Sequence, residues 1–198
     1  MPIAINGSGT VTGISVGGLP DGIVDTDMIA ANAVTAPKRG PGAILQVVHV
    51  TKTDHFTTTS TTYTDVTGMA ASITPTSANS EIIVRFDLQL GGSSNLYAHA
   101  KCQRLIAGGS YADLQKGDTV GQHERANMNM DSDVSYGYVK GSNNCFSLKD
   151  TTHNTTSQIT YKLVCHCTSG TIYVNRYHND STNSTAGTSS VMLMEVAA

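Results

Sequence analysis

The stretch Glu81-Ile-Ile-Val-Arg-Phe-Asp-Leu-Gln-Leu90 decides the fold class of this chain of 198 residues. Apolar side chains alternate in it with mostly polar ones, which is the period of two of a β-strand that buries one face. The stretch 96–104 repeats this alternation. The residues expected to face the core are Ile82, Val84, Phe86, Leu88 and Leu90 in the first stretch, and Leu96, Ala98, Ala100 and Cys102 in the second.

Strand-like patterning continues along the rest of the chain, interrupted by turns rich in Thr, Ser, Gly and Asn. About ten short strands of this kind predict an all-β, antiparallel β-sandwich that is jelly-roll-like, with a barrel as the alternative. Thr168-Ser-Gly-Thr171 predicts a hairpin, and 111–127 predicts a long loop. The expected strands are 44–51, 56–67, 69–74, 81–90, 96–104, 136–139, 145–148, 158–168, 171–177 and 191–196.

The last expected strand, Val191-Met-Leu-Met-Glu-Val196, is apolar on both faces apart from Glu195. A strand of this composition needs cover on both sides. We expect the second sheet and a loop, or a neighbouring subunit, to provide it.

The first forty residues differ from the rest of the chain. Gly, Thr and Ser interrupt them too often for a core strand, and the short helix expected over 27–34 is not stable alone. Two prolines and two glycines within 35–42 indicate a hinge. The sequence therefore predicts an N-terminal segment, residues 1–41, that another surface must order, and a β-sandwich head, residues 42–198.

Composition excludes several classes of function. Charged residues make up only 14% of the chain, against about 25% in an average globular protein, and tryptophan is absent. The net charge of -3 provides no basic stripe for nucleic acid. No signal peptide is readable and no apolar run approaches the roughly 20 residues that span a bilayer. We expect a soluble protein made in the cytoplasm, with no nucleic-acid partner and no membrane insertion.

The four cysteines are Cys102, Cys145, Cys165 and Cys167. Within a strand, Cys165 and Cys167 point to one face and His166 to the other, so the three cannot chelate one ion. Buried, reduced core cysteines are the favoured interpretation, and a disulfide or a metal ligand are the alternatives.

No arrangement of residues favours catalysis. Asp131 and Asp133 extend a ladder that begins with Asn127 and Asn129, and a solvated strand face explains it; a cation site and a glycosidase-like pair are the alternatives. The seven histidines lack metalloprotease or zinc-finger spacing, and no serine lies in a Gly-x-Ser-x-Gly elbow. We expect no enzyme activity, no cofactor and no bound metal.

The stretch 107–130 concentrates long polar side chains on a scaffold otherwise made of Thr and Ser. Loops on rigid sandwiches are common places for recognition. We therefore take Tyr111, His123 and Arg125 as candidate receptor contacts, with a merely solvated connection as the alternative.

Two stretches resemble fibre-type virion proteins of tailed phages, particularly cyanophages. One is Gly18-Leu-Pro-Asp-Gly-Ile-Val-Asp-Thr-Asp-Met-Ile-Ala-Ala-Asn-Ala-Val-Thr-Ala-Pro-Lys38, similar to their attachment segments. The other begins at Ile44-Leu-Gln-Val-Val-His-Val50 and continues through Ser60-Thr-Thr-Tyr-Thr-Asp-Val-Thr-Gly-Met69 and Ile73-Thr-Pro-Thr-Ser-Ala-Asn-Ser-Glu-Ile-Ile-Val84, similar to the opening strands of their distal domains. The resemblance covers about residues 17–90.

This resemblance implies a homotrimer in the virion, docked on other tail, baseplate or capsid proteins through residues 1–41. The first hypothesis is a short tail or baseplate fibre whose distal β-domain contacts the host surface, with a surface glycan as candidate ligand. The alternative is a capsid-decorating head fibre or cement protein, and a glycan-degrading spike is third. The resemblance assigns no individual residues; our candidate attachment and trimer contacts are the apolar residues Ile3, Ile5, Val11, Ile14, Leu19, Ile23, Met28 and Ile29.

Overall fold

The computed structural model describes residues 33–35, 38–93, 95–131, 139–177 and 186–198. Its contacts divide the chain into Met1–Arg39 and Gly40–Ala198, and every described strand belongs to the second unit. The expected helix over 27–34 lies almost entirely outside the described residues, and Ala33 and Val34 are not helical. The eight candidate attachment contacts, from Ile3 to Ile29, also lie outside them. Among the described residues, no helix is long and apolar enough to cross a membrane.

One sheet, sheet A, has β4 at its centre. β4 pairs with β11 on one side and with β8 on the other, and β1 pairs with the far side of β11. Beyond the first residues of β11, the short strand β10 pairs with the last part of β4, and β2 pairs with β10. All of these pairings are antiparallel. The strands are β1 (Ile44–Lys52), β2 (Phe56–Thr58), β4 (Glu81–Gly92), β8 (Val139–Asp150), β10 (Ile172–Val174) and β11 (Ser189–Val196).

The other sheet, sheet B, has the order β3-β9-β5-β6, and β7 also pairs with β5. All of its pairings are antiparallel as well. The strands are β3 (Thr64–Ile73), β5 (Tyr97–Ile106), β6 (Ala112–Asp113), β7 (Met128–Asp131) and β9 (Ile159–Ser169).

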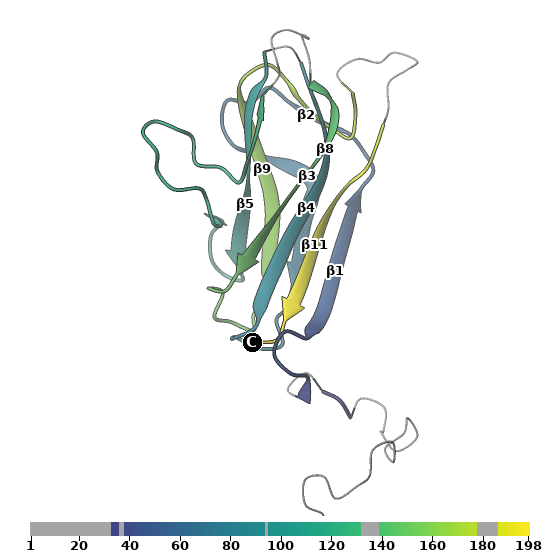
Figure 1. Cartoon of the computed structure of the whole chain (residues 1–198), viewed down its shortest axis with the longest axis vertical. Helices are drawn as coiled ribbons and strands as arrows, with labels where there is room; N and C mark the ends of the chain where they lie inside the picture. Colours follow the sequence, from purple (N-terminus) through teal and green to yellow (C-terminus); the bar gives the residue numbers. More distant parts are fainter. Residues whose placement is uncertain (1–32, 36–37, 94, 132–138, 178–185) are drawn as a thin grey trace, which may run out of the picture. The chain divides into compact units, whose positions relative to one another are not determined.

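The strand order is that of a jelly roll. If β1, β3, β4, β5, β7, β8, β9 and β11 are counted from 1 to 8, sheet A reads 1-8-3-6 and sheet B reads 2-7-4-5. This order folds two Greek keys into two facing sheets, as Figure 1 shows. The predicted all-β, jelly-roll-like sandwich is thus confirmed.

The core lies between the two sheets and follows the predicted alternation. Ile82, Val84 and Phe86 of β4 are fully buried, and Leu96, just before β5, and Ala98 of β5 belong to the same core cluster and are also fully buried. Burying one such aliphatic or aromatic side chain contributes about 1.5–3 kcal/mol. The inner faces of the two sheets therefore supply most of the stability of the fold.

The cysteine prediction is correct for three of four residues. Cys102, Cys165 and Cys167 are buried and free, but Cys145 is exposed and free. Burial raises the pKa of the Cys102 and Cys165 thiols to about 12, which keeps them protonated. Cys145 differs because its position on β8 opposes Asp87, on the outer face of sheet A.

Two strand boundaries were predicted wrongly. The sequence predicts separate strands at 56–67 and 69–74, whereas β3 runs through Gly68 with a register shift between Asp65 and Ala70. Gly68 has a φ of +83°, so an irregularity within the strand produces the apparent break. The strand predicted at 136–139 lies outside the described residues except for Val139, and the one predicted at 145–148 is part of the longer β8, which pairs with nearly the whole of β4.

The predicted hairpin at Thr168-Ser-Gly-Thr171 is wrong. The turn is present, with Gly170 at φ +80°, but β9 before it belongs to sheet B and β10 after it belongs to sheet A. The turn therefore carries the chain from one sheet to the other. A Cβ on Gly170 would lie 2.8 Å from Ser93 Oγ and 3.0 Å from Leu96 Cα, so this crossing has no room for a side chain.

Candidate recognition surface

The loop over 107–127, between β5 and β7, is fastened to sheet B by Asp113. The Asp113 carboxylate pairs with Lys101 Nζ at 2.8 Å and with Lys116 Nζ at 3.1 Å. It also accepts a hydrogen bond of 2.9 Å from Gln103 Nε2. Burial alone would raise the pKa of Asp113, but hydrogen bonds from Lys101, Gln103 and Lys116 lower it to about 2. The carboxylate is therefore charged at neutral pH.

Asn127 fastens the other end of the same loop. Its Oδ1 accepts a hydrogen bond of 2.8 Å from the backbone N–H of Cys102 on β5. Its Nδ2 donates to the carbonyl oxygens of Leu114 at 3.3 Å and Gln115 at 2.7 Å. One amide side chain thus joins the sheet and two points of the loop, whereas the sequence predicted Asn127 to be part of a solvated ladder.

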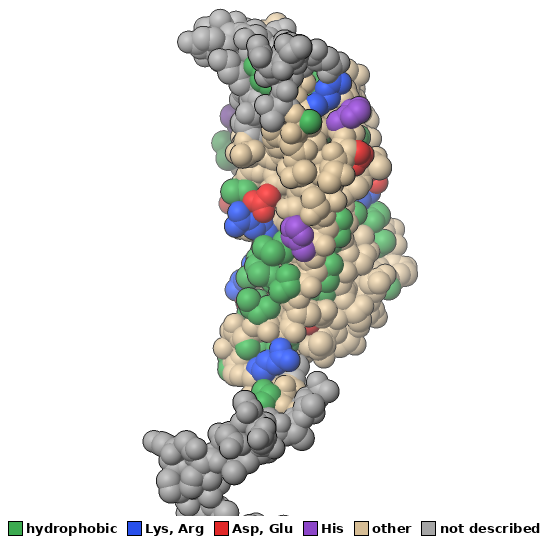
Figure 2. Space-filling view, turned by 90° about the vertical axis from the view of Figure 1, so that its right-hand side faces the viewer, with side chains coloured by type: hydrophobic (Ala, Val, Ile, Leu, Met, Phe, Trp, Pro, Cys, Tyr) green, Lys and Arg blue, Asp and Glu red, His purple; other side chains and the backbone are tan. Residues whose placement is uncertain are grey.

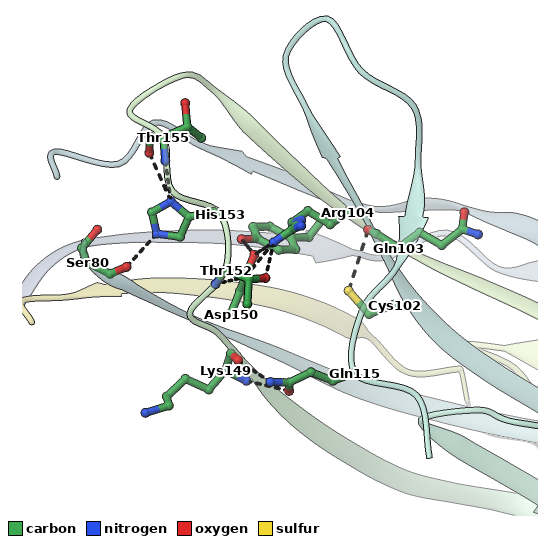
Figure 3. Close-up of polar contacts among 11 residues, drawn as sticks. Ser80, Cys102, Gln103, Arg104, Gln115, Lys149, Asp150, Thr152, His153 and Thr155 are labelled. Atoms are coloured by element: carbon green, nitrogen blue, oxygen red, sulfur yellow. Dashed lines mark hydrogen bonds and ion pairs between the residues drawn. The ribbon is translucent and has the colours of Figure 1, made fainter. Parts of the chain in front are cut away.

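The loop also reaches sheet A, as the close-up in Figure 3 shows. Gln115 bonds to the backbone of Lys149 on β8 through both ends of its amide, as donor to the carbonyl and as acceptor from the N–H. Within the loop, Arg125 Nε donates to the carbonyl of Gly117 at 2.7 Å. These contacts hold the loop across the sandwich.

Beneath the loop, the outer face of sheet B carries a cluster of aromatic and cationic groups. The rings of Tyr63 and His166 lie 4.4 Å apart between centroids, and those of His99 and His166 lie 5.3 Å apart. Lys101 Nζ lies 3.6 Å from the centre of the Tyr63 ring, a cation–π contact. The Tyr63 hydroxyl donates to Glu124 of the loop at 2.9 Å. We call these five residues the histidine cluster.

His166 is the least exposed member of the cluster, with 7% of its surface accessible. Among the described residues, neither of its ring nitrogens has a hydrogen-bond partner. Burial and the neighbouring His99 lower the pKa of His166, so its ring is neutral at pH 7. The described part of the chain contains no group of three His, Cys, Asp or Glu residues placed to hold a metal ion.

A hollow of about 260 Å³ opens beside this cluster. It presents one carboxylate, two imidazoles and two amides, next to the thioether of one methionine. Such a set offers both donors and acceptors of hydrogen bonds around a small apolar floor, which suits a polyhydroxyl ligand. Its lining residues are His99, His123, Glu124, Ala126, Asn127, Met128 and Asn129.

The three candidate receptor contacts are all exposed but occupy different surroundings. Tyr111 is 40% exposed, with Lys162 Nζ 3.8 Å from its ring centre. His123 lines the hollow. Arg125 bonds to its own loop at Gly117. His123 is thus the candidate that the structure places in a concave site.

The rest of the predicted Asn/Asp ladder is described only in part. Asn129 is exposed, and Met130 opposite is 7% exposed, in agreement with the predicted alternation of β7. Asp131 ends β7, but its side chain is not among those described, and Asp133 lies outside the described residues. The predicted roles of these two carboxylates stay predictions.

Sequence reasoning missed a buried ion pair that joins the two sheets. Asp150 of β8 is 1% exposed and accepts hydrogen bonds of 2.7 and 2.8 Å from Arg104 Nη1 of β5 and one of 2.8 Å from the Tyr161 hydroxyl of β9. Figure 3 shows Arg104, Asp150 and Thr152 converging, with His153 bonded to Ser80 nearby. Burial alone would raise the pKa of Asp150, but the Arg104 hydrogen bond and the Thr152 backbone lower it. This network braces the sandwich.

A second hollow, of about 420 Å³, lies on sheet A. An exposed, bidentate pair of Arg85 and Asp87 stands at its side, with the free thiol of Cys145. In the described part of the chain, the hydrogen bonds of this pair run from Arg85 to Asp87. The lining residues are Arg85, Asp87, Leu88, Asn143, Asn144, Cys145 and Thr188.

Comparison with known proteins gives a limited result. No family model matches the chain, and no curated protein matches it. Among solved structures, it is similar to a chain of the infectious bursal disease virus Gx strain, with 14% identity, a TM-score of 0.36 and coverage of 77% of this chain and 36% of that one. A structure of the Gt strain has 15% identity and a TM-score of 0.34, with coverage of 77% of this chain and 42% of that one. The VP2 subviral particle of the same virus has 13% identity and a TM-score of 0.34, with coverage of 77% and 38%. This chain thus spans less than half the length of those chains.

Proposed function

We propose that this protein is a non-enzymatic virion structural protein, a short tail or baseplate fibre whose jelly-roll head contacts the host surface. The observation that carries the proposal is the loop over 107–127, fastened to both sheets and bordering a polar hollow. A loop held by Asp113, Gln115 and Asn127 on a rigid sandwich keeps its exposed side chains in place. Binding then requires little ordering of the loop.

The chemistry of the hollow indicates the ligand class. His99, His123 and Glu124 supply imidazole and carboxylate groups, and Asn129 supplies an amide, whereas the amide of Asn127 is already bonded to Cys102 and the loop. Hydroxyl groups of a glycan can donate to the carboxylate and accept from the imidazole and amide N–H groups. A host-surface glycan is therefore the ligand that we propose for this face.

Residues 1–41 serve, in this proposal, to attach the protein to the virion and to form the trimer. The resemblance to fibre attachment segments supports docking on tail, baseplate or capsid proteins as a homotrimer. We expect the full chain to have about three times the mass of one 20.8 kDa chain in solution, and a version beginning at Gly42 to lose that association. If both samples have the mass of a single chain, the proposal that residues 1–41 form a trimer is contradicted.

A binding experiment tests the head directly. We expect the full chain to bind host cells or a glycan array, and His123→Ala to weaken that binding at least severalfold, since the imidazole lines the hollow. Thr57→Ala on β2, exposed and in sheet A, is the matched control and should bind like the wild type. A His123→Ala variant that binds as well as the wild type would reject this face as the contact.

A second candidate function, a capsid-decorating head fibre or cement protein, is favoured by a different observation. The outer face of sheet A is apolar around Val47 and Met194, which suits contact with protein rather than glycan. This candidate predicts co-sedimentation with capsids and no binding to cells. Binding of the full chain to cells but not to capsids would reject it.

A further inference from the structure

The outer face of sheet A carries an apolar patch beside its edge strand. The strand register puts Val47 of β1, Met194 of β11 and Ile83 of β4 in one row, and Met192 in the next row. Val47 is 52% exposed, and the other three are partly exposed. Figure 2 looks onto the β1 edge beside this face and shows hydrophobic side chains gathered near the middle of the head, with charged side chains just above them. We call these four residues the sheet A patch.

The strand next to the patch, β1, is the outermost strand of sheet A on this side. β1 is nine residues long, contains no proline, and pairs only with β11 among the described strands. Ile44 at its start is 53% exposed. Native proteins block or cover long apolar edge strands, since such edges associate with other chains. The patch thus lies beside the outermost strand of the sheet, and its exposed apolar side chains call for cover.

Charges on this face are balanced within it. Arg85 pairs with Asp87 at 2.8 Å, and Lys149 pairs with Glu81 at 2.8 Å. A face with unbalanced charge would repel its own copy, whereas this face meets a copy of itself without net repulsion. The same balance leaves no excess charge to recruit a partner of opposite sign.

We propose that copies of this chain pack against one another through the outer face of sheet A, with the sheet A patch nearest the symmetry axis. Residues close to the axis of a cyclic oligomer meet their own equivalents, so an apolar patch there covers itself. A stable interface buries about 800 Å² on each partner, which exceeds four side chains. The interface therefore extends to the ion pairs Arg85–Asp87 and Lys149–Glu81. Because each pair is neutral, a second copy can pack there without charge repulsion.

This inference shares one element with the proposed function, the association of copies, but assigns it to the head rather than to residues 1–41. The two can fail separately. Trimer formation through the N-terminal segment is read from the solution mass, whereas contact through sheet A is read from the patch itself.

Met192 and Met194 allow the solvent accessibility of the patch to be measured in the full chain. Hydrogen peroxide converts an accessible methionine to its sulfoxide, and mass spectrometry measures the rate at each position. Met128, partly exposed on sheet B, is the internal reference. The test variant is Val47→Glu, which adds a charge to the patch at a position exposed enough to keep it hydrated in a separate chain. The matched control is Ala70→Glu, an exposed position on β3, the edge strand of sheet B.

We expect wild-type protein to have the mass of more than one chain and to oxidise Met192 and Met194 slowly. Val47→Glu should raise both rates severalfold and leave the Met128 rate unchanged, and Ala70→Glu should behave like the wild type. Equal Met192 and Met194 rates in wild type and Val47→Glu would overturn the proposal, whatever the mass. Protected methionines in a protein with the mass of one chain would also overturn it, because the cover would then come from the chain itself.

Discussion

The outer faces of the two sheets differ in how they are covered. The face of sheet B carries polar and aromatic groups, and the chain's own loop over 107–127 lies across it, bonded to this sheet through Asp113 and Asn127. The face of sheet A carries the apolar sheet A patch on β1, β11 and β4, whereas the loop over 107–127 meets that sheet at β8, where Gln115 bonds to Lys149. A polar face can be closed by hydrogen bonds from one loop, whereas an apolar face gains most from a large dry contact.

This difference separates two roles within one head. The sheet B face presents donors and acceptors to a ligand, and its loop keeps them in place. The sheet A face offers apolar area and balanced charge to another protein surface. We infer that the head uses sheet B for recognition and sheet A for assembly, and each prediction below tests whether these faces are independent.

The largest effect is expected at the brace between the sheets. Asp150→Ala removes the carboxylate that holds Arg104 of β5 and the Tyr161 hydroxyl of β9. Losing one member of a buried ion pair costs about 3–5 kcal/mol, because the other charge stays without its partner. Urea denaturation should show this loss as a lower midpoint for the whole head, if the two faces belong to one cooperative unit.

The control for this experiment is Asp87→Ala on the outer face of sheet A. Its pair with Arg85 is exposed at both ends, with 47% and 43% of the two side chains accessible. Solvent screens such a pair in a separate chain, so we expect no resolvable change in the urea midpoint of samples diluted until the copies separate. A loss of stability as large as that of Asp150→Ala would mean that this exposed pair stabilises the head as strongly as the buried pair does.

A smaller effect is expected where the loop meets sheet B. Asn127→Ala leaves the buried N–H of Cys102 without its acceptor and frees the carbonyls of Leu114 and Gln115. An unsatisfied buried group costs about 1–3 kcal/mol. Limited proteolysis should cut the variant faster within 107–127, while peroxide oxidation of Met192 on sheet A stays unchanged.

Thr119→Ala, exposed in the same loop, serves as the control and should resist protease like the wild type. Faster oxidation of Met192 in Asn127→Ala would show that the two faces are coupled. The sheet B face and the sheet A face could then no longer be treated as independent.

Local patterns in the sequence predicted the parts of the fold that depend on alternation. The period of two in β4 gave the correct buried set. For β11, cover is confirmed on the inner face, where Val191 and Leu193 are buried, and stays a prediction on the outer face, where Met192 and Met194 are partly exposed. The same reasoning placed Glu195 apart, and the structure shows why it is tolerated. Burial would raise the pKa of Glu195, but hydrogen bonds from Gln46, Ser80 and Thr76 lower it.

What failed depends on partners distant in the sequence. The turn at Gly170 is a clear local signal, but which sheet the next strand joins is decided by its pairing with β4. Asn127 was assigned to a solvated face, because nothing nearby in the sequence reveals its bond to Cys102, 25 residues earlier. Likewise Asp150 and Arg104 are 46 residues apart. Periodicity determines which face a residue takes, and only the tertiary fold determines what it meets there.

The smallest effect expected is the acid sensitivity of the loop. The pKa of Asp113 is lowered from 3.8 to about 2 in the folded protein, so its contribution is complete above the unfolded value and is lost as the pH falls through the folded one. Because solvent screens part of this interaction, Asp113→Asn should cost about 1 kcal/mol at pH 7. The difference in unfolding free energy between wild type and variant should stay constant from pH 7 to about 5 and shrink between about pH 4 and 2. Denaturation of both proteins at each pH measures it, and the double difference cancels the contributions of Asp150 and Glu195. A difference that instead grows as the pH falls would mean that the protonated carboxyl is the form that holds the loop, and the electrostatic closure of the sheet B face would have to be abandoned.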